Sequence, residues 1–390
     1  MTSPVLTRPA PTRLTTSPTA LPGAPTVRTA PTTRRPAPST APSPAPPTTA
    51  PEAAQQRAWW PTALKAVLGI GLTGALLVWA LPHAIGASWS EIGHTVASVQ
   101  PWQLGALAAL WLLGLAVHTL ALSAGMPGLS HRRAFLLNIT GSFVSNLLPL
   151  GGAAGTVANY SMARSWGFGS VAFGRWALVT NIWDTMIKLA LPAVAVGWLA
   201  ATTTGNHSLA MAAVISVAAL VLLTVGVTTV FRSDRLARAL GRTAGRVALR
   251  LRRPVDPTTW AEQASGMRAD TNELVSTGWL RLTIGKLAYA ALQAVLLWAC
   301  LAVVGLTVTP AIVFAAFAMQ SVLTLFVLTP GAAGFVEVGM AGILVALGVP
   351  AAGAAAGILL YRGFVFLMEI PVGGLLMAAW MARRPKLAQA

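Results

Sequence analysis

Apolar runs long enough to cross a lipid bilayer recur along most of this chain, and they limit the folds it can adopt. A membrane-spanning helix needs roughly 20 mostly apolar residues. Only 9% of the residues are charged, whereas soluble domains carry roughly 25% because their surfaces face water. The pattern therefore predicts an all-α polytopic membrane protein. Its predicted full spans are 62–82, 104–125, 171–200, 208–231, 279–305 and 351–382.

Two further apolar stretches, 134–163 and 311–348, are interrupted near their middles. The first contains Pro149-Leu150-Gly151-Gly152 and the second contains Pro330-Gly331. Backbone groups freed by such breaks are tolerated at membrane depth only inside protein or facing water. Both stretches are therefore predicted to be broken helices or re-entrant hairpins, giving six full spans and two hairpins. Eight complete spans are the alternative that hydropathy leaves open.

Basic residues gather in particular connections, which indicates the orientation of the chain. The segments 83–103, 201–207 and 306–310 contain no Arg or Lys. The basic connections carry Arg132, Arg133, Arg232, Arg235, Arg238, Arg242, Arg246, Arg250, Arg252, Arg253, Arg383, Arg384 and Lys386. Cytoplasmic loops of membrane proteins are enriched in these residues, so both termini are predicted to be cytoplasmic. The net charge of +17 follows from these loops and does not indicate a nucleic-acid partner.

Three regions are expected from composition. Residues 1–58 are rich in Pro, Thr and Arg without apolar periodicity, which predicts a disordered cytoplasmic tail. Residues 59–382 form the predicted transmembrane domain and 383–390 a cytoplasmic C-terminus. Within the domain, 232–278 is predicted to be a basic cytoplasmic loop containing an amphipathic helix, with its arginines near anionic lipid.

The two break points resemble each other. NLLPLGGAAG at 146–155 and FVLTPGAAG at 326–334 share a Leu, a Pro and Gly-Ala-Ala-Gly, and each hairpin is preceded by two predicted spans and followed by one. The threading brings the hairpins in from opposite faces, which is the inverted repeat of many transporters. Glycines at these breaks are expected to let backbones approach: Gly152, Gly155, Gly331 and Gly334.

Charged residues inside apolar spans mark candidate binding sites, because they are costly in lipid. Asp184 and Lys188 are four residues apart and share a helix face. Glu337 follows the second break, and Arg362 and Glu369 are seven apart in the last span. A buried Glu beside an Arg can hold a lipid phosphate by exchange, with the guanidinium taking the phosphate bidentately.

Other ionisable residues are interpreted differently. Arg175 and Lys286 lie near predicted span ends, so they are expected to anchor the helices by reaching towards the headgroups. The histidines lack metal-ligand spacing, and the chain contains no P-loop or GxSxG elbow. We therefore expect no metal, no cofactor and no enzymatic activity.

The C-terminal residues resemble a known family. FVLTPGAAGFVEVGMAGILVALGVPAAGAAAGILLYRGFVFLMEIPVGG at 326–374 contains a Pro-Gly break, a Gly-x-x-Glu, a Leu-Gly-Val-Pro turn and a Tyr-Arg. It is similar to the closing signature of the lysylphosphatidylglycerol synthase transmembrane-region family, a flippase-like membrane domain. By this resemblance Glu337, Pro350, Tyr361 and Arg362 occupy motif positions. NITGSFVSNLLPLGGAAG resembles the family's earlier break, and Asp184 fits an Asp of the next span.

Two departures from the family pattern remove charge from the first half. Gly155-Thr156-Val157-Ala158-Asn159 stands where the family usually has Gly-Glu-x-x-Arg, and Asn181 stands where it usually has an Arg. In bifunctional members this membrane domain moves an aminoacylated phospholipid made by an attached soluble domain. The chain ends about eight residues after the last predicted span, so aminoacyl transfer is not expected here.

Two functions are compatible with these features. The first is a lipid translocase of the bacterial plasma membrane, acting on an anionic phospholipid or a polyprenyl-phosphate-linked lipid. In it Arg362 would meet the phosphate, Tyr361 would stand beside it, and Glu337, Glu369, Asp184 and Lys188 would supply exchangeable charge. The alternative is a non-transporting partner subunit of a glycosyltransferase or lipid-modifying enzyme. Anionic headgroups are the expected partners in both cases.

Overall fold

The computed structural model describes residues 71, 72, 74–148, 151–202, 207–250, 256–325 and 329–383. The tail predicted over 1–58 and most of the C-terminal segment predicted over 383–390 lie outside these residues. All the elements within them are helical, with π turns at η2 and η4 and a 3-10 turn at η3. In chain order they are η2 (Leu76–Ala80), α2 (Leu81–Ile85), α3 (Trp89–Ala97), α4 (Pro101–Gly125), α5 (His131–Leu147), α6 (Gly151–Ser165), α7 (Ser170–Thr202), α8 (His207–Arg232), α9 (Asp234–Arg250), α10 (Pro257–Val303), α11 (Pro310–Leu323), η3 (Pro330–Ala332), α12 (Phe335–Ala346), α13 (Ala351–Arg362), η4 (Gly363–Leu367) and α14 (Glu369–Arg383).

Four helical stretches in the described chain are long and apolar enough to cross a membrane. They are Pro101–Gly125, Ser170–Thr202, Gly278–Val303 and Ala351–Arg383, the last of which joins α13, η4 and α14. Each coincides with a predicted span. Of the other two predictions, 62–82 is described only at 71, 72 and 74–82, which include η2 and the start of α2, and 208–231 falls within the helix α8. The chain is therefore a multi-pass membrane protein.

The two interrupted stretches each contain two short helices. α5 and α6 have 17 and 15 residues and pack against each other, and α11 and α12 have 14 and 12 and do the same. At about 1.5 Å per residue, each is shorter than the roughly 30 Å hydrocarbon layer. Pro149 and Leu150 lie outside the described residues, whereas Pro330 and Gly331 form the turn η3.

Helix starts follow ordinary capping chemistry. Ser88 and Glu91 form a capping box at α3, in which each side chain accepts the other's backbone N–H. Pro101 and Pro310 stand in the first turns of α4 and α11, where a missing N–H costs nothing. Asp256 caps α10 by accepting the N–H of Thr258 at 3.0 Å.

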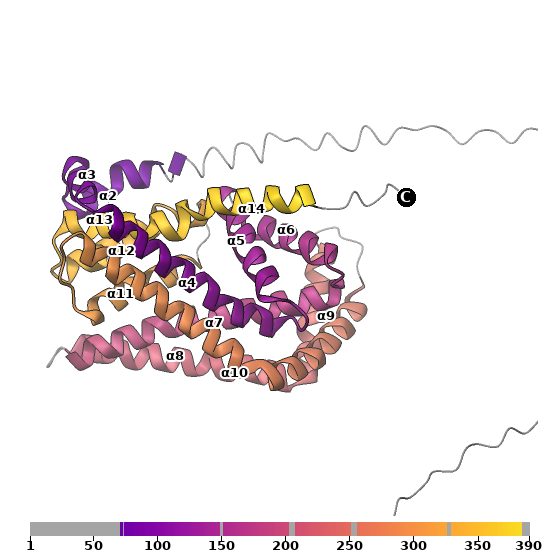
Figure 1. Cartoon of the computed structure of the whole chain (residues 1–390). Helices are drawn as coiled ribbons and strands as arrows, with labels where there is room; N and C mark the ends of the chain where they lie inside the picture. Colours follow the sequence, from indigo (N-terminus) through magenta and orange to yellow (C-terminus); the bar gives the residue numbers. More distant parts are fainter. Residues whose placement is uncertain are drawn as a thin grey trace, which may run out of the picture. The chain divides into compact units, whose positions relative to one another are not determined.

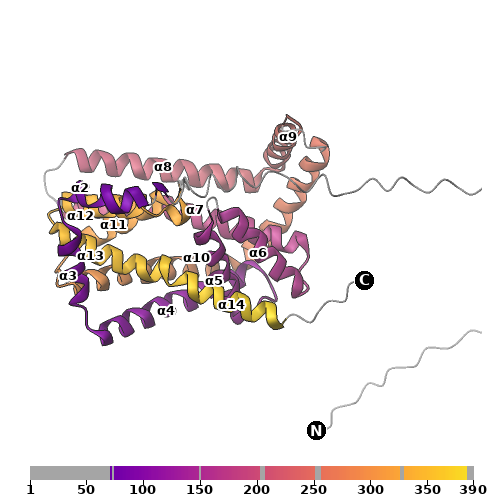
Figure 2. The same cartoon turned by 90° about the horizontal axis from the view of Figure 1, so that it is seen from above.

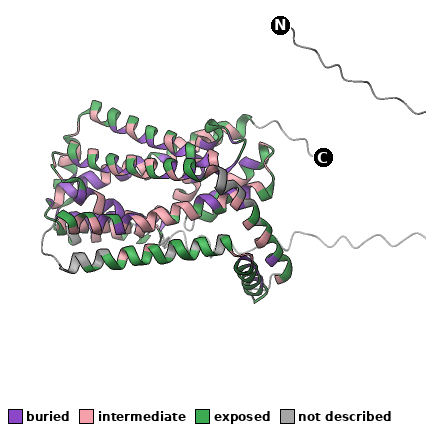
Figure 3. Cartoon of the chain, turned by 90° about the horizontal axis from the view of Figure 1, so that it is seen from below, coloured by how far each residue is buried: buried purple, intermediate pink, exposed green. Residues whose placement is uncertain are grey.

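Long helices lie side by side to form the body of the molecule (Figures 1 and 2). α10 packs along α4, α7 packs against α8 and α11, and α14 packs against α5. Buried Leu297, Leu301, Met340 and Tyr361 belong to the largest core cluster. Many large apolar side chains are exposed on the outer surface, and Leu222 of α8 is 73% exposed. Figure 3 shows that exposed residues run along most of the outer helices. Such a surface matches acyl chains better than water.

The basic segment folds back on the long helix α10. Small residues face α10 from α9, and a Cβ added at Gly241 would lie 2.5 Å from the Trp260 carbonyl oxygen. Asp234 at the start of α9 pairs with Arg238 at 2.7 Å and Arg268 at 3.6 Å, and it accepts a hydrogen bond from Ser265. α9 is seen nearly end-on in Figures 2 and 3, where α8 is seen lengthwise. The helix expected within 232–278 is therefore two helical segments: α9 and the first part of α10.

Candidate functional site

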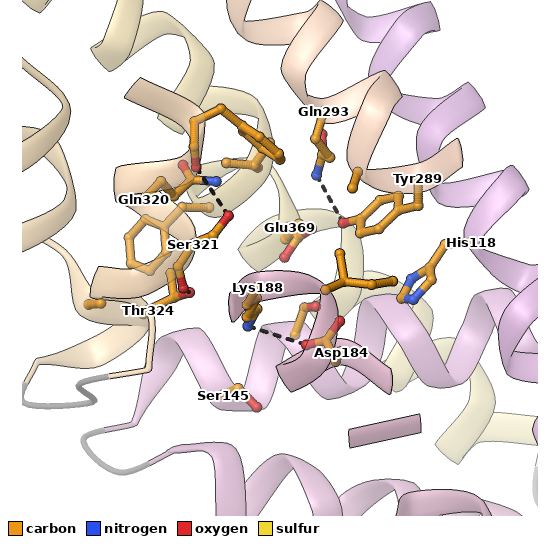
Figure 4. A pocket seen from close by; sticks show the side chains of 18 of the residues that line it. His118, Ser145, Asp184, Lys188, Tyr289, Gln293, Gln320, Ser321, Thr324 and Glu369 are labelled. Carbon is orange, nitrogen blue, oxygen red and sulfur yellow. Dashed lines mark hydrogen bonds and ion pairs between the residues drawn. The ribbon is translucent and has the colours of Figure 1, made fainter. Parts of the chain in front are cut away.

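A cavity of about 540 Å³ lies among the spans and the two pairs of short helices. Figure 4 shows side chains from several helices pointing into it. Its polar lining consists of His118, Asn138, Ser142, Ser145, Asn146, Asn181, Asp184, Lys188, Lys286, Tyr289, Gln293, Gln320, Ser321, Thr324, Tyr361, Arg362 and Glu369. Helices from both halves of the sequence therefore build one polar chamber inside an apolar body.

Arg362 is fixed to the second break by two hydrogen bonds. Its Nε donates to Glu337 Oε1 at 2.6 Å, and its Nη2 donates to the carbonyl oxygen of Gly331 at 3.0 Å. The other oxygen of Glu337 accepts the N–H of Gly334 at 2.6 Å. Arg362 and Glu337 are only 8% and 3% exposed. The ion pair thus locks the end of α13 to the turn before α12.

The guanidinium keeps donors for a further partner. Of its five N–H groups, one on Nε and one on Nη2 are used in these bonds. Arg362 lines the cavity, whereas Glu337 lies behind it and does not. The Phe366 ring covers the guanidinium, with its centroid 4.8 Å from Cζ. A buried guanidinium with free Nη donors is suited to a phosphate or carboxylate, which it can bind bidentately.

A second charge cluster joins α7 to α10. Asp184 contacts Lys188 at 3.2 Å, as their spacing predicts, and also contacts Lys286 at 3.1 Å. Lys286 is 5% exposed and lines the cavity. The expectation that Lys286 anchors a helix in the headgroup layer is therefore wrong. Its ammonium turns inward because the Asp184 carboxylate is available there.

Glu369 completes the charged lining. It is 5% exposed and accepts a hydrogen bond from Asn146 Nδ2 at 3.2 Å. The π turn η4 separates Glu369 from Arg362, and its bond from Met368 N–H to Gly363 carbonyl measures 2.8 Å. In a regular α-helix, a spacing of seven would put Arg362 and Glu369 on one face. A π turn advances less per residue than an α turn, so that regular spacing is interrupted here. Both side chains still line the cavity.

Two glutamine–tyrosine couples stand on the cavity wall. On α10, Gln293 donates to the Tyr289 hydroxyl at 2.9 Å, and Gln320 of α11 donates to the Tyr361 hydroxyl of α13 at 2.9 Å. His118 stacks on Tyr289, with ring centroids 4.2 Å apart. Sequence reasoning missed most of these residues. Positions 286, 289 and 293 follow the spacing of one helix face, and that periodicity of polar residues in an apolar span was the available signal.

The family model described as the lysylphosphatidylglycerol synthase TM region matches residues 66–373 of the chain. The chain belongs to this family. The match includes every residue that lines the cavity. A comparison with curated proteins finds no match.

One of the two departures from the pattern of the lysylphosphatidylglycerol synthase TM-region family lies inside the cavity. Asn181, where the family usually has an arginine, lines the wall and donates to the Ala177 carbonyl at 2.7 Å. Asp184, one turn further along, takes its cationic partners from Lys188 and from Lys286 on another helix. Positive charge at this wall thus comes from lysines.

The four glycines singled out in this family member have different surroundings. A Cβ added at Gly155 would lie 2.7 Å from the Gly141 carbonyl oxygen, so there the α5 and α6 backbones do approach. Gly331 and Gly334 have positive φ angles of 57° and 89°, which disfavour other residues. A Cβ at either would collide with the side chain of Phe366 or Leu76. At Gly152 the expectation of close approach is wrong, because an added Cβ would meet nothing within 4 Å.

The predicted site residues fall into two groups. Those that line the cavity are Gly152, Asp184, Lys188, Gly331, Tyr361, Arg362 and Glu369. Glu337, Gly155 and Gly334 lie outside its lining. Glu337 and Gly334 hold the turn that positions Arg362, whereas Gly155 packs the first pair of short helices.

Proposed function

We propose that this chain moves a phosphate-bearing anionic lipid, a phospholipid or a polyprenyl-phosphate-linked lipid, across the bacterial plasma membrane. The observation that carries the proposal is the position of Arg362. It is buried, lines a polar cavity, is held by Glu337 and the Gly331 carbonyl, and keeps donors for an anion. Buried ionisable groups in membrane spans most often serve a substrate pathway.

Binding would use the Nη donors of the guanidinium that Glu337 and the Gly331 carbonyl leave free. A lipid phosphate takes the free Nη donors of Arg362, while Glu337 keeps its bond from the Gly334 N–H. Lys188, whose side chain is 31% exposed, meets the phosphate from the α7 wall. Because Asp184 already has two lysine partners, shifting one of them to phosphate leaves no carboxylate unpaired.

The short helices support movement of the lipid in addition to its binding. α5 with α6 and α11 with α12 are each too short to cross the bilayer singly, and both pairs contribute cavity residues. In the proposed inverted repeat they enter from opposite faces, so that displacing one pair opens the cavity to one leaflet. The positive-inside pattern supports a cytoplasmic position for both termini and for the Arg-rich α9.

The test is transbilayer movement in liposomes. Purified chain is reconstituted with acyl-labelled phosphatidylglycerol, and outer-leaflet label is removed by a membrane-impermeant quencher. We expect movement above empty liposomes, loss of that movement in Arg362→Gln, and retention in Arg235→Gln, whose side chain is exposed on α9. Folded protein that moves no phosphate lipid contradicts the proposal. Stoichiometric co-purification of a glycosyltransferase or lipid-modifying enzyme would then support the partner-subunit alternative.

A further inference from the structure

The two glutamine–tyrosine couples on the cavity wall have hydrogen-bonding capacity that the bond within each couple leaves unused. In each, an amide nitrogen donates to a phenol oxygen: Gln293 to Tyr289 and Gln320 to Tyr361, both at 2.9 Å. The phenol O–H proton and the amide carbonyl oxygen are not consumed by that bond. In the described chain, Gln320 Oε1 is buried without a hydrogen-bond partner. The Gln320–Tyr361 couple therefore has a free acceptor beside its phenol donor, and Gln293–Tyr289 has the same arrangement of groups.

A hydroxyl group matches such a couple, because it donates one hydrogen bond and accepts others. The neighbouring lining adds the same kind of group, with amides at Asn138 and Asn181 and hydroxyls at Ser142 and Ser145. Of these, Asn138 Nδ2 is buried without a partner in the described part of the chain, and a buried polar group in that state costs free energy. A ligand rich in hydroxyl groups would meet this requirement, whereas an apolar or simple ionic ligand would not.

The cavity lining has more cations than carboxylates, which disfavours an ammonium headgroup: Lys188, Lys286 and Arg362 stand against Asp184 and Glu369. The carboxylate of Asp184 already contacts two lysines, and that of Glu337 contacts Arg362. The aromatic surfaces that attract ammonium groups are partly covered, because His118 stacks on Tyr289 and Arg362 lies over the Phe366 ring. Glu369 accepts a hydrogen bond from the neutral amide of Asn146, and its carboxylate can accept from a headgroup hydroxyl in the same way.

We infer that the cavity selects a lipid whose phosphate bears a polyhydroxylated headgroup without an ammonium, such as inositol, a sugar or glycerol. Arg362 holds the phosphate, and the couples Gln293–Tyr289 and Gln320–Tyr361 read the hydroxyl groups. The inference rests on the proposed function and narrows its substrate class. It also covers two lipid anchors, since a diacylglycerol and a polyprenyl chain can carry the same phosphate-linked polyol.

The experiment compares anionic lipids that differ only in the headgroup. Full-length protein in liposomes is supplied with acyl-labelled phosphatidylinositol or phosphatidylserine, and their rates of transbilayer movement are measured. We expect phosphatidylinositol to move at least about fivefold faster. Gln293→Leu and Gln320→Leu should each slow phosphatidylinositol about three- to tenfold, the range for one or two neutral hydrogen bonds, and leave phosphatidylserine unchanged. Gln263→Leu, exposed on α10 outside the cavity, is the matched control.

The outcomes distinguish failure of the headgroup inference from failure of the proposed lipid translocation. Equal or faster movement of phosphatidylserine overturns the headgroup inference and leaves translocation standing. The headgroup inference is also overturned if phosphatidylinositol moves faster but neither Gln293→Leu nor Gln320→Leu slows it. If neither lipid moves, the proposed function fails, and the inference is decided by binding: short-chain phosphatidylinositol must raise the melting temperature in detergent more than short-chain phosphatidylserine. To identify the lipid anchor, unlabelled lipids compete with labelled phosphatidylinositol for movement. Stronger inhibition by a polyprenyl phosphohexose than by unlabelled phosphatidylinositol assigns the polyprenyl anchor.

Discussion

Arg362 Nε lies 2.6 Å from Glu337 Oε1, although the two residues are 25 positions apart and belong to different helices. The bond joins α13 to the turn that begins α12, so the anion-binding guanidinium and the second break form one unit. Both side chains are buried. A buried pair of this kind is strongly destabilising when only one partner is removed.

Arg362→Gln should therefore lower the free energy of unfolding by about 3–5 kcal/mol, because it leaves the Glu337 carboxylate buried without its cation. The double variant Glu337→Gln, Arg362→Gln should recover most of that loss and still fail to move lipid. Thermal unfolding in detergent and the liposome assay measure the two effects separately. A double variant as unstable as the single one would contradict the coupling.

The two lysines at Asp184 should differ in importance. Lys286→Met removes a cation that is 5% exposed and should destabilise by about 3 kcal/mol, the low end for loss of a buried ion-pair partner, because Asp184 keeps Lys188. Lys188→Met removes a side chain that is 31% exposed and should cost less than about 1 kcal/mol. The melting temperatures of the two variants check this. Equal effects would restore the headgroup-anchor interpretation of Lys286.

Gly331 and Gly152 both line the cavity and provide a matched comparison. Gly331→Ala must adopt a φ of 57° and place its Cβ 2.3 Å from the Phe366 ring. It should lose roughly 1–2 kcal/mol from the left-handed backbone alone, plus the cost of moving the ring. Gly152→Ala meets open space and should unfold within about 0.5 kcal/mol of the parent. Tolerance of Gly331→Ala would mean that the turn differs from the one described.

The start of α10 should depend on acid pH. Hydrogen bonds from the Thr258 hydroxyl and N–H, and then from Thr259, lower the pKa of Asp256 to about 2. A lowered pKa means that the cap stabilises the helix above the unfolded value of about 3.9 and is lost as the pH falls towards 2. Hydrogen exchange, corrected for intrinsic rates, should show loss of protection at Thr258–Trp260 in that window. Asp256→Ala should show reduced protection at pH 6 and no further loss on acidification.

One face of α9 should lie at the lipid surface. Leu236, Leu240 and Val247 are exposed and share a helix face beside the arginines. The chain's single cysteine, Cys300, is buried, so a Cys300→Ala background allows one label to be added. An environment-sensitive dye on Leu240→Cys should be quenched by brominated lipid in anionic nanodiscs. The dye on Ala239→Cys, exposed on the arginine side, should not; equal quenching would contradict this placement.

Rare charges in apolar spans made four of the five charged residues of the cavity lining predictable. Asp184, Lys188, Arg362 and Glu369 stand out in an apolar sequence, and the structure places all four at one cavity. Lys286 was misread because hydropathy ends the span near 279, whereas α10 continues as one helix from Pro257 to Val303. Lys286 is therefore well inside a helix, and the direction of its side chain depends on Asp184 from another segment. Helical spacing likewise could not distinguish Gly155 from Gly152, because their neighbours come from the fold.

The π turn at Gly363–Leu367 has the geometry expected if one extra residue is inserted into the last helical span while the helix continues on either side. Met368 N–H bonds five residues back, to Gly363, so the helix resumes with one residue more than an α turn would need. An α-helix advances about 100° per residue, and the wide turn cancels that extra rotation. A relative with a one-residue gap here would keep its cavity residues in register although the Arg-to-Glu spacing falls from seven to six. Alignments of the family should therefore match these two residues across such a gap.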